Sequence, residues 1–333
     1  VETIAPGRQP RLFFLHILLP HHPWEYLPDG KRYSSALPWQ PGLTDDRWTG
    51  DPELVIQAQQ RQLLQVGFTD RVLGDILGRL RAQRLYDDAL VIVTADHGES
   101  FRAHGERRRV NSGNLEDIAF VPLLVKLPDQ RDGRIEDAHV QTVDILPTIA
   151  DVLGARVPWR TDGRSLLRVR PGEEPQVGVF TSSGERVTGA ASDLVRRRDV
   201  ALRRQLELFG AGLFRIGPHS ELIGREVDGL AAASPRTQRI RLLGGTAYDP
   251  DSAFVPVHVA GILLGADAGK DVAIAVNGRI GGVTRSYEYG GKTWFSVVLR
   301  EDAFRRGSND VRVFLVESEE GSLRLVEIPP DGS

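Results

Sequence analysis

The pattern of apolar and polar positions predicts strands that alternate with helices over the first half of the chain. Residues 11–19 form a near-continuous apolar block, which suits a strand covered on both faces. Apolar residues then recur at helical spacing between residues 52 and 84, behind an Asp-Pro-Glu helix start at residues 51–53, which predicts one long helix or two helices broken near Gly67. Two compact apolar runs follow at residues 89–94 and 121–126. Strands separated by helices predict a mostly parallel α/β sheet with flanking helices.

The pattern changes to alternation of apolar and polar residues towards the C-terminus. From about Ala253 onward, apolar residues stand at every second position in several short runs. Asn277-Gly278 separates two of these runs and is a strong hairpin signal. We therefore expect two domains, an α/β domain over residues 1–245 and a small antiparallel β-domain, of sandwich type, over residues 246–333.

Composition excludes several classes of function. The 42 basic and 45 acidic side chains leave a formal net charge of −3, which gives no long-range field for collecting nucleic acid or an acidic membrane surface. We therefore expect no nucleic-acid role. Cysteine is absent, which excludes both a disulfide framework and a thiol nucleophile. The apolar block at residues 11–19 is far shorter than the roughly 20 residues of a membrane helix.

The first candidates for a functional site are Asp96, His97 and Gly98, which follow the apolar run at residues 89–94. In parallel α/β sheets, ligands bind beyond the carboxyl ends of the strands. A carboxylate oxygen and a neutral imidazole nitrogen are metal donors, and Gly98 permits the tight turn that would aim both into one crevice. This mixed donor pair favours Zn²⁺ or Mn²⁺ over Ca²⁺, which prefers oxygen ligands alone. An isolated Asp-His pair, however, more often serves as a cap and a local hydrogen bond.

The histidines are clustered, since five of the eight lie in two short segments. His104 follows the Asp-His pair, and His21 follows the apolar block at residues 11–19, again at the end of a predicted strand. If both strands belong to one parallel sheet, His21 and His104 meet the Asp-His pair in one crevice. His16 is evenly balanced between a site residue and a structural one, and we interpret His22 as a loop residue.

These motifs resemble the sulfatase-like branch of the alkaline-phosphatase superfamily. The resemblance rests on DHGESF at residues 96–101, His104-Gly105 and the segment 16–23, with support from residues 115–123 and 143–148. The branch includes sulfatases, phosphonate and phosphodiester hydrolases, and phosphoethanolamine and lipoteichoic-acid transferases. The resemblance covers about residues 11–230 and implies an alkaline-phosphatase/sulfatase-like α/β fold.

The resemblance also implies roles for individual residues. Asp96 and His97 match metal ligands of the family, and His21 and His104 match residues that contact the transferring sulfate or phosphate group, which makes them the catalytic candidates. The implied cofactor is a divalent metal, and the implied substrate is a sulfate or phosphate ester. Relatives of this type are often extracytoplasmic and membrane-tethered, so we expect the intact protein to contact a membrane only through a segment ahead of Val1.

Two features of the family pattern are not matched. Family members carry an acidic metal ligand and a Ser, Thr or Cys nucleophile ahead of the segment that matches residues 16–24, where this chain has only a short leader. We therefore expect this chain to be the C-terminal portion of an enzyme and inert, or nearly so, alone. Many sulfatases also carry a lysine shortly after the metal pair, whereas residues 107–109 are arginines here.

A binding module is the alternative interpretation. In that case a degenerate α/β domain and the β-domain would recognise a glycan or another cell-envelope partner without catalysis. Tyr287, Tyr289 and Trp294 could line a sugar-stacking surface on residues 246–333, although such aromatic residues more often belong to a core or to a strand edge.

Overall fold

The computed structural model describes the chain apart from residues 1, 8, 10, 34–36, 38, 169–175, 233–236, 320 and 333. The fold is mixed α/β with small sheets, and the chain divides into two compact units. The first unit consists of Val1–His16 and Val72–Leu202, and the second of Ile17–Arg71 and Arg203–Ser333. The second unit thus includes residues 17–71 and 203–245 as well as the predicted β-domain.

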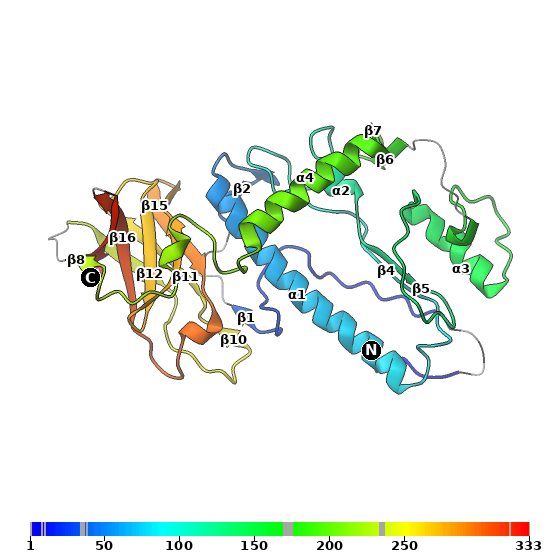
Figure 1. Ribbon diagram of the computed structural model, residues 1–333, viewed down its shortest axis with the longest axis horizontal. Coiled ribbons are helices and arrows are strands. Elements are labelled where there is room, and N and C mark those ends of the chain that lie inside the picture. The colour runs from blue at the N-terminus through cyan, green and yellow to red at the C-terminus, as the bar shows by residue number, and fades with distance from the viewer. Residues whose placement is uncertain are drawn as a thin grey trace. The chain divides into compact units, whose positions relative to one another are not determined.

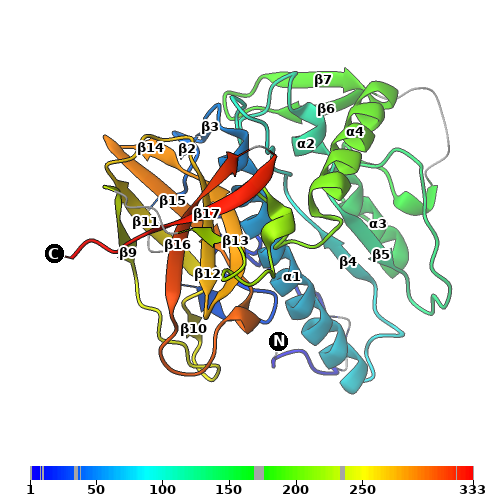
Figure 2. The same cartoon turned by 60° about the vertical axis from the view of Figure 1, so that its left-hand side comes forward.

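The second unit contains two sheets whose strands, coloured yellow to red, lie together in Figures 1 and 2. One sheet has the order β14-β15-β11-β9 and the other β13-β12-β16-β17-β8. Neighbouring strands pair antiparallel except β8 and β17, which are parallel. The strands are β8 (Ala231–Ala232), β9 (Arg239–Leu243), β11 (His258–Leu264), β12 (Asp271–Val276), β13 (Arg279–Arg285), β14 (Tyr287–Tyr289), β15 (Lys292–Val298), β16 (Val311–Glu319) and β17 (Ser322–Ile328).

One buried cluster draws its side chains from both sheets. It includes Ile274 of β12 and Val313 of β16 from one sheet, and Phe295 of β15 from the other. Alternation of inward and outward residues along each strand produces this common core. The predicted hairpin at Asn277-Gly278 is confirmed, because it joins β12 to β13 and both residues have positive φ angles, 51° and 84°. A type I′ turn requires these angles, which Asn and Gly tolerate best.

The helix α1 (Pro52–Ala82) is continuous over 31 residues, so of the two possibilities that the periodicity left open, the structure has the single long helix. The predicted start is also confirmed, because the amide of Glu53 donates to Oδ1 of Asp51 at 2.9 Å. Residues 52–71 of α1 belong to the second unit and residues 72–82 to the first. Shorter elements accompany α1 in the second unit. They are β1 (Arg32–Tyr33), β2 (Leu43–Thr44), β3 (Arg47–Trp48), β10 (Phe254–Val255) and the 3₁₀ turns η3 (Ser220–Leu222) and η4 (Glu301–Ala303).

The first unit contains two small antiparallel sheets, β4-β5 and β6-β7. The helices α2 and α3 and the first part of α4 also belong to it. Its elements are β4 (Val91–Thr94), α2 (Leu115–Ala119), β5 (Leu123–Lys126), η1 (Thr142–Asp144), α3 (Ile145–Leu153), η2 (Leu166–Arg168), β6 (Gln176–Phe180), β7 (Arg186–Ala190) and α4 (Ala191–Phe209). No helix in the described part of the chain is both long and apolar enough to cross a membrane.

The pairing of β4 with β5 differs from the parallel arrangement that the sequence predicts. Val91 lies opposite Lys126 and Thr94 opposite Leu123, so the two strands are antiparallel. A parallel pair needs a crossover connection that returns the chain to the opposite end of the sheet. Here the connection folds back beside its own start, because the amide of Gly98 donates to the carbonyl oxygen of Ile118 at 2.8 Å.

The strand predicted at residues 11–19 is absent from this structure. Residues 11–18 form neither helix nor strand, and their apolar side chains are exposed, Phe14 to 84%. Strand formation requires a neighbour that supplies backbone hydrogen bonds, and none of the described strands pairs with this segment. The apolar pattern alone therefore did not determine the local structure.

Candidate metal and anion site

Asp96 and His97 follow β4 after one intervening residue, at the strand end where the sequence places them. The Asp96 side chain is 85% exposed and the His97 side chain 38% exposed. Both therefore lie at the surface of the first unit, where a solute can reach them.

The hydrogen bonds of His97 select one form of its ring. Nδ1 lies 2.8 Å from the carbonyl oxygen of Gly98, and because a carbonyl can only accept, Nδ1 carries the proton. The lone pair of the neutral ring is then on Nε2, which lies 3.9 Å from Oδ2 of Asp96. Histidine ligands of metals characteristically donate their other ring N–H in this way. The arrangement of His97 and Asp96 therefore fits two donors for one divalent ion.

Gly98 is required by close packing. A Cβ atom at this position would lie 2.0 Å from the carbonyl oxygen of Asp117 in α2, far inside van der Waals contact. The sequence predicts a tight reversal at Gly98, but in the structure its role is to allow the close approach of two backbone segments.

His104 lies at the exposed tip of a closed turn in the same loop. The amide of Ser100 donates to the carbonyl oxygen of Arg107 at 2.9 Å. The amide of Gly105 donates to the carbonyl oxygen of Arg102 at 2.8 Å. His104 itself has a φ of 61°, which is uncommon for a residue other than glycine. Asp96, His97 and His104 are thus carried by one loop of the first unit.

A buried ion-pair network holds this loop against α2. The guanidinium of Arg102 bonds to Asp117 at 2.7 Å through Nε and also to Glu116, whose side chain is fully buried. Ser100 donates to the same Asp117 carboxylate at 2.7 Å. On the other side of Glu116, Nη2 of Arg197 lies 2.7 Å from Oε2, without the alignment of a hydrogen bond. Sequence reasoning did not assign these roles, although Glu116 and Asp117 lie in one of the segments that carry the family resemblance.

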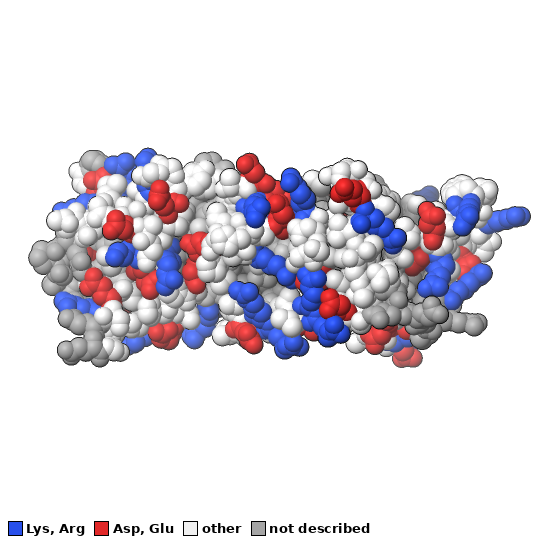
Figure 3. All heavy atoms as spheres, turned by 90° about the horizontal axis from the view of Figure 1, so that it is seen from above, with Lys and Arg blue, Asp and Glu red and all other residues white. Residues whose placement is uncertain are grey.

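The three arginines at residues 107–109 do not act as one basic patch. Arg107 is buried, and its Nη1 lies 2.7 Å from Oε1 of Glu99. The positive charge of Arg107 is therefore paired with Glu99 within the loop. Basic and acidic side chains are interspersed over the face seen in Figure 3.

His21 belongs to the second unit and His16 to the first. The amide of His21 donates to the carbonyl oxygen of Leu18 at 2.8 Å, and its side chain is exposed. The meeting of His21 with Asp96, His97 and His104 in one crevice stays a prediction. Among the residues that the structure describes, no group of three or more His, Cys, Asp or Glu side chains could hold a metal ion.

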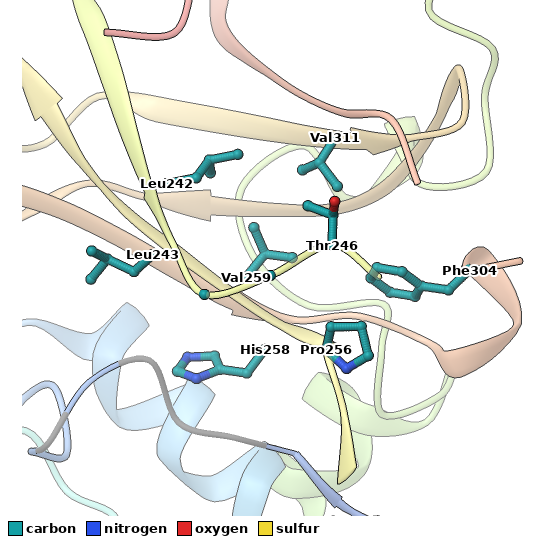
Figure 4. A pocket seen from close by; sticks show the side chains of 10 residues that line it. Leu242, Leu243, Thr246, Pro256, His258, Val259, Phe304 and Val311 are labelled. Carbon is teal, nitrogen blue, oxygen red and sulfur yellow. The ribbon is translucent and has the colours of Figure 1, made fainter. Parts of the chain in front are cut away.

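Two hollows in the second unit do not suit a sulfate or phosphate ester. The pocket in Figure 4 has a volume of about 10 Å³, which is room for about one water molecule. A larger hollow of about 320 Å³ has Asp267, Asp271 and Glu317 in its lining against the single cation of Lys270. Acidic side chains outnumber cations in this lining, which disfavours an anionic ester, although Asp271 is also paired with Arg285.

The family similarity of this chain lies in its first half. Residues 1–155 match the family model described as Sulfatase, and this segment includes all four candidate site residues. Over these residues, slightly less than half of the chain, the sequence is similar to the sulfatase family. This confirms the resemblance to the sulfatase-like branch of the alkaline-phosphatase superfamily.

The similarity to individual relatives covers short segments. A multifunctional alkaline phosphatase superfamily protein, PehA, of Trinickia caryophylli is 36% identical over 100 residues, 29% of this chain and 19% of that protein. Human arylsulfatase K is 36% identical over 99 residues, 30% of this chain and 18% of the relative. Choline-sulfatase of Rhizobium meliloti is 29% identical over 126 residues, 37% of this chain and 24% of the relative. The matches thus span a quarter or less of these relatives.

Among solved structures, the phosphonate monoester hydrolase SpPMH of Silicibacter pomeroyi is similar to this chain at 17% identity. The similarity covers 91% of this chain and 48% of that chain, with a TM-score of 0.30. This score supports no structural argument.

Proposed function

We propose that this chain contributes to a metal-dependent site that hydrolyses or transfers sulfate or phosphate esters. The family match over residues 1–155 carries the proposal, since it supports a sulfatase-like hydrolase at the family level and includes the loop with Asp96, His97 and His104. Two donors side by side and a third polar residue on the same exposed loop are among the features that such chemistry needs.

Asp96 and His97 would hold the divalent ion, with Zn²⁺ or Mn²⁺ favoured over Ca²⁺ because one donor is a nitrogen. A bound ion of this kind polarises the ester group and stabilises negative charge on its oxygens. The hydrogen bond from Nδ1 to the Gly98 carbonyl oxygen fixes the His97 ring with Nε2 as the donor atom. His104 and His21 would donate hydrogen bonds to the outer oxygens of the transferring group.

The nucleophile and an acidic metal ligand complete the proposed site, and the motif for neither is matched in this chain. Transfer of this type depends on positioning and electrostatics, so the loss of both groups should cost several powers of ten in rate. We therefore propose that the chain alone is inert or nearly so. From the family resemblance we also propose that the intact protein is extracytoplasmic and membrane-tethered. Ester hydrolysis by the chain alone at rates usual for enzymes would overturn this proposal.

The proposal is tested by metal binding to the full chain. Isothermal titration with Zn²⁺ should give at least about tenfold weaker binding for Asp96→Ala/His97→Ala than for the unsubstituted chain, because two direct donors are lost. Asp137→Ala/His139→Ala is the matched control, since it removes the same residue types from another part of the first unit. Equal Zn²⁺ affinity of all three proteins would refute the assignment of Asp96 and His97.

The glycan-binding alternative gains no support from the aromatic residues that suggested it. Tyr287 and Trp294 are buried, and only Tyr289 of the three is substantially exposed, at 46%. One face of Tyr289 is stacked on Trp39, with 4.4 Å between the ring centroids. A sugar-stacking surface made of these three rings is therefore not available in the second unit.

A further inference from the structure

One side chain from α1 anchors the loop that carries His21. Gln65 is only 1% exposed, and its amide bonds to four backbone groups. Nε2 donates to the carbonyl oxygens of His21 at 2.8 Å and Pro23 at 3.3 Å. Oε1 accepts from the amides of Glu25 at 2.9 Å and Tyr26 at 3.3 Å. Both donors and both lone pairs of the side chain are therefore used, and the backbone partners fix which end is oxygen.

A second buried side chain holds the same loop. The hydroxyl of Tyr33 donates to the carbonyl oxygen of Trp24 at 2.6 Å. Burial raises the pKa of Tyr33, so the hydroxyl stays protonated and remains a donor. Tyr33 lies in β1, which pairs with β10, and its ring belongs to the main buried cluster of the second unit. The loop is thus held by α1 and by the strand layer.

The polar face of α1 connects Gln65 to the C-terminal strands. Gln57 donates to Thr284 Oγ1 of β13 at 2.8 Å, and Gln60 donates to the carbonyl oxygen of Leu213 at 2.8 Å. All three of Gln57, Gln60 and Gln65 are buried, and of these only Gln60 has an amide oxygen without a hydrogen-bond partner. Burying an amide is costly unless it is hydrogen-bonded, so apolar side chains would fill this face at less risk to stability. The hydrogen bonds of these amides instead fix the rotation of α1 about its axis and its position along that axis relative to neighbouring segments.

We propose that Gln65 is a positioning residue for His21, and that the C-terminal strands set the position of His21 through α1 and β1. This inference rests on the proposed function, because it takes His21 as a residue that contacts the transferring group. In this proposal the β-strands need not bind a ligand themselves, because their role is to determine where the backbone of residues 21–26 lies.

The first experiment tests, without any ligand, whether Gln65 holds the backbone of the loop. Gln65→Met keeps the side-chain volume but removes all four hydrogen bonds, and Tyr33→Phe removes one hydroxyl. In the full chain, amide hydrogen exchange at Glu25 and Tyr26 should become roughly tenfold faster in Gln65→Met, since each amide loses its acceptor. Gln62→Met, which changes a residue three positions earlier in α1, should leave both rates unchanged. Unchanged exchange in Gln65→Met would overturn the proposal.

The second experiment reads out the function of the loop. Inorganic phosphate is titrated into the Zn²⁺-supplemented full chain, and the Hε1 resonances of His21 and His104 are followed by NMR. The His21 response should require at least about fivefold more phosphate in Gln65→Met and in Tyr33→Phe, while the His104 response is unchanged. Equal responses of His21 in all variants would overturn the positioning role. No response of either histidine in the unsubstituted chain would instead overturn the proposed function, and the exchange rates would still test whether Gln65 holds the loop.

Discussion

The Nε2 atom of His258 lies 2.5 Å from an Nη atom of Arg61 in the interior of the second unit. An arginine can only donate, so His258 accepts through Nε2 and is neutral. Burial, together with the charge of Arg61, lowers the pKa of His258 well below its ordinary value. The structure thus places a neutral histidine and a cation side by side in a core.

This pair predicts that the protein loses stability in mild acid. Above the ordinary histidine pKa of about 6.5, His258 is neutral in both the folded and unfolded chain and contributes no pH dependence. Below it, only the unfolded chain takes up the proton, so the free energy of unfolding falls by up to about 1.4 kcal/mol per pH unit. Urea unfolding between pH 8 and pH 5 measures this. His258→Gln, which retains an acceptor, should flatten the curve, and parallel curves for the two proteins would contradict the prediction.

Gly98 and Gly74 should respond in opposite ways to alanine. Gly98→Ala forces a Cβ against the Asp117 carbonyl oxygen and should lower the free energy of unfolding by about 1–3 kcal/mol. Gly74 lies inside α1, and a Cβ added there would meet no atom within 4 Å outside the backbone of the helix itself. Gly74→Ala should therefore stabilise the protein by about 0.5–1 kcal/mol. Thermal unfolding of the two variants measures both effects. Equal shifts would show that the backbone contact at residue 98 is not formed.

Removal of the Glu116 charge should be costly. Glu116→Gln leaves Arg102 and Arg197 without their common carboxylate, and loss of one member of a buried ion pair typically costs about 3–5 kcal/mol. Arg102 and Arg197 are partly exposed, so the lower end of this range is expected. The control is Asp193→Asn, which breaks an exposed pair with Arg196 and should change stability by less than about 1 kcal/mol. Denaturant midpoints compare the two, and similar midpoints would refute the structural role of Glu116.

Metal selectivity provides a separate test of the donor pair. Zn²⁺ should bind the full chain at least about tenfold more tightly than Ca²⁺, because imidazole nitrogen is a poor ligand for Ca²⁺. Competition between the two ions, followed through the His97 ring resonances, measures this ratio. A preference for Ca²⁺ would exclude His97 as a ligand, and removal of Zn²⁺ with a chelator should restore the original spectrum.

Much of the local structure could be predicted from the sequence. Helical periodicity and the cap at Asp51 located α1, Asn277-Gly278 located a hairpin, and the apolar run before Asp96 located β4. Each of these signals acts over a few residues, and the structure satisfies it locally. The direction of strand pairing could not be predicted in this way, because it depends on the path of the connection between β4 and β5.

The polar face of α1 was missed for a physical reason. Gln57, Gln60 and Gln65 recur with helical spacing, and such a stripe ordinarily indicates a face exposed to solvent. In this protein the stripe is buried, and each glutamine meets a bonding partner that is distant in sequence. The only available signal was that amides, and not charged residues, dominate the stripe.

The core of the C-terminal strands also has a consequence for dissecting the molecule. Tyr33 and Leu64 are fully buried members of the cluster that includes Phe295 and Val313. A recombinant piece that began at residue 246 would lack both side chains and expose their binding surfaces to water. Expression of the β-rich half by itself should therefore give insoluble material unless residues 17–71 are supplied on the same or a second polypeptide.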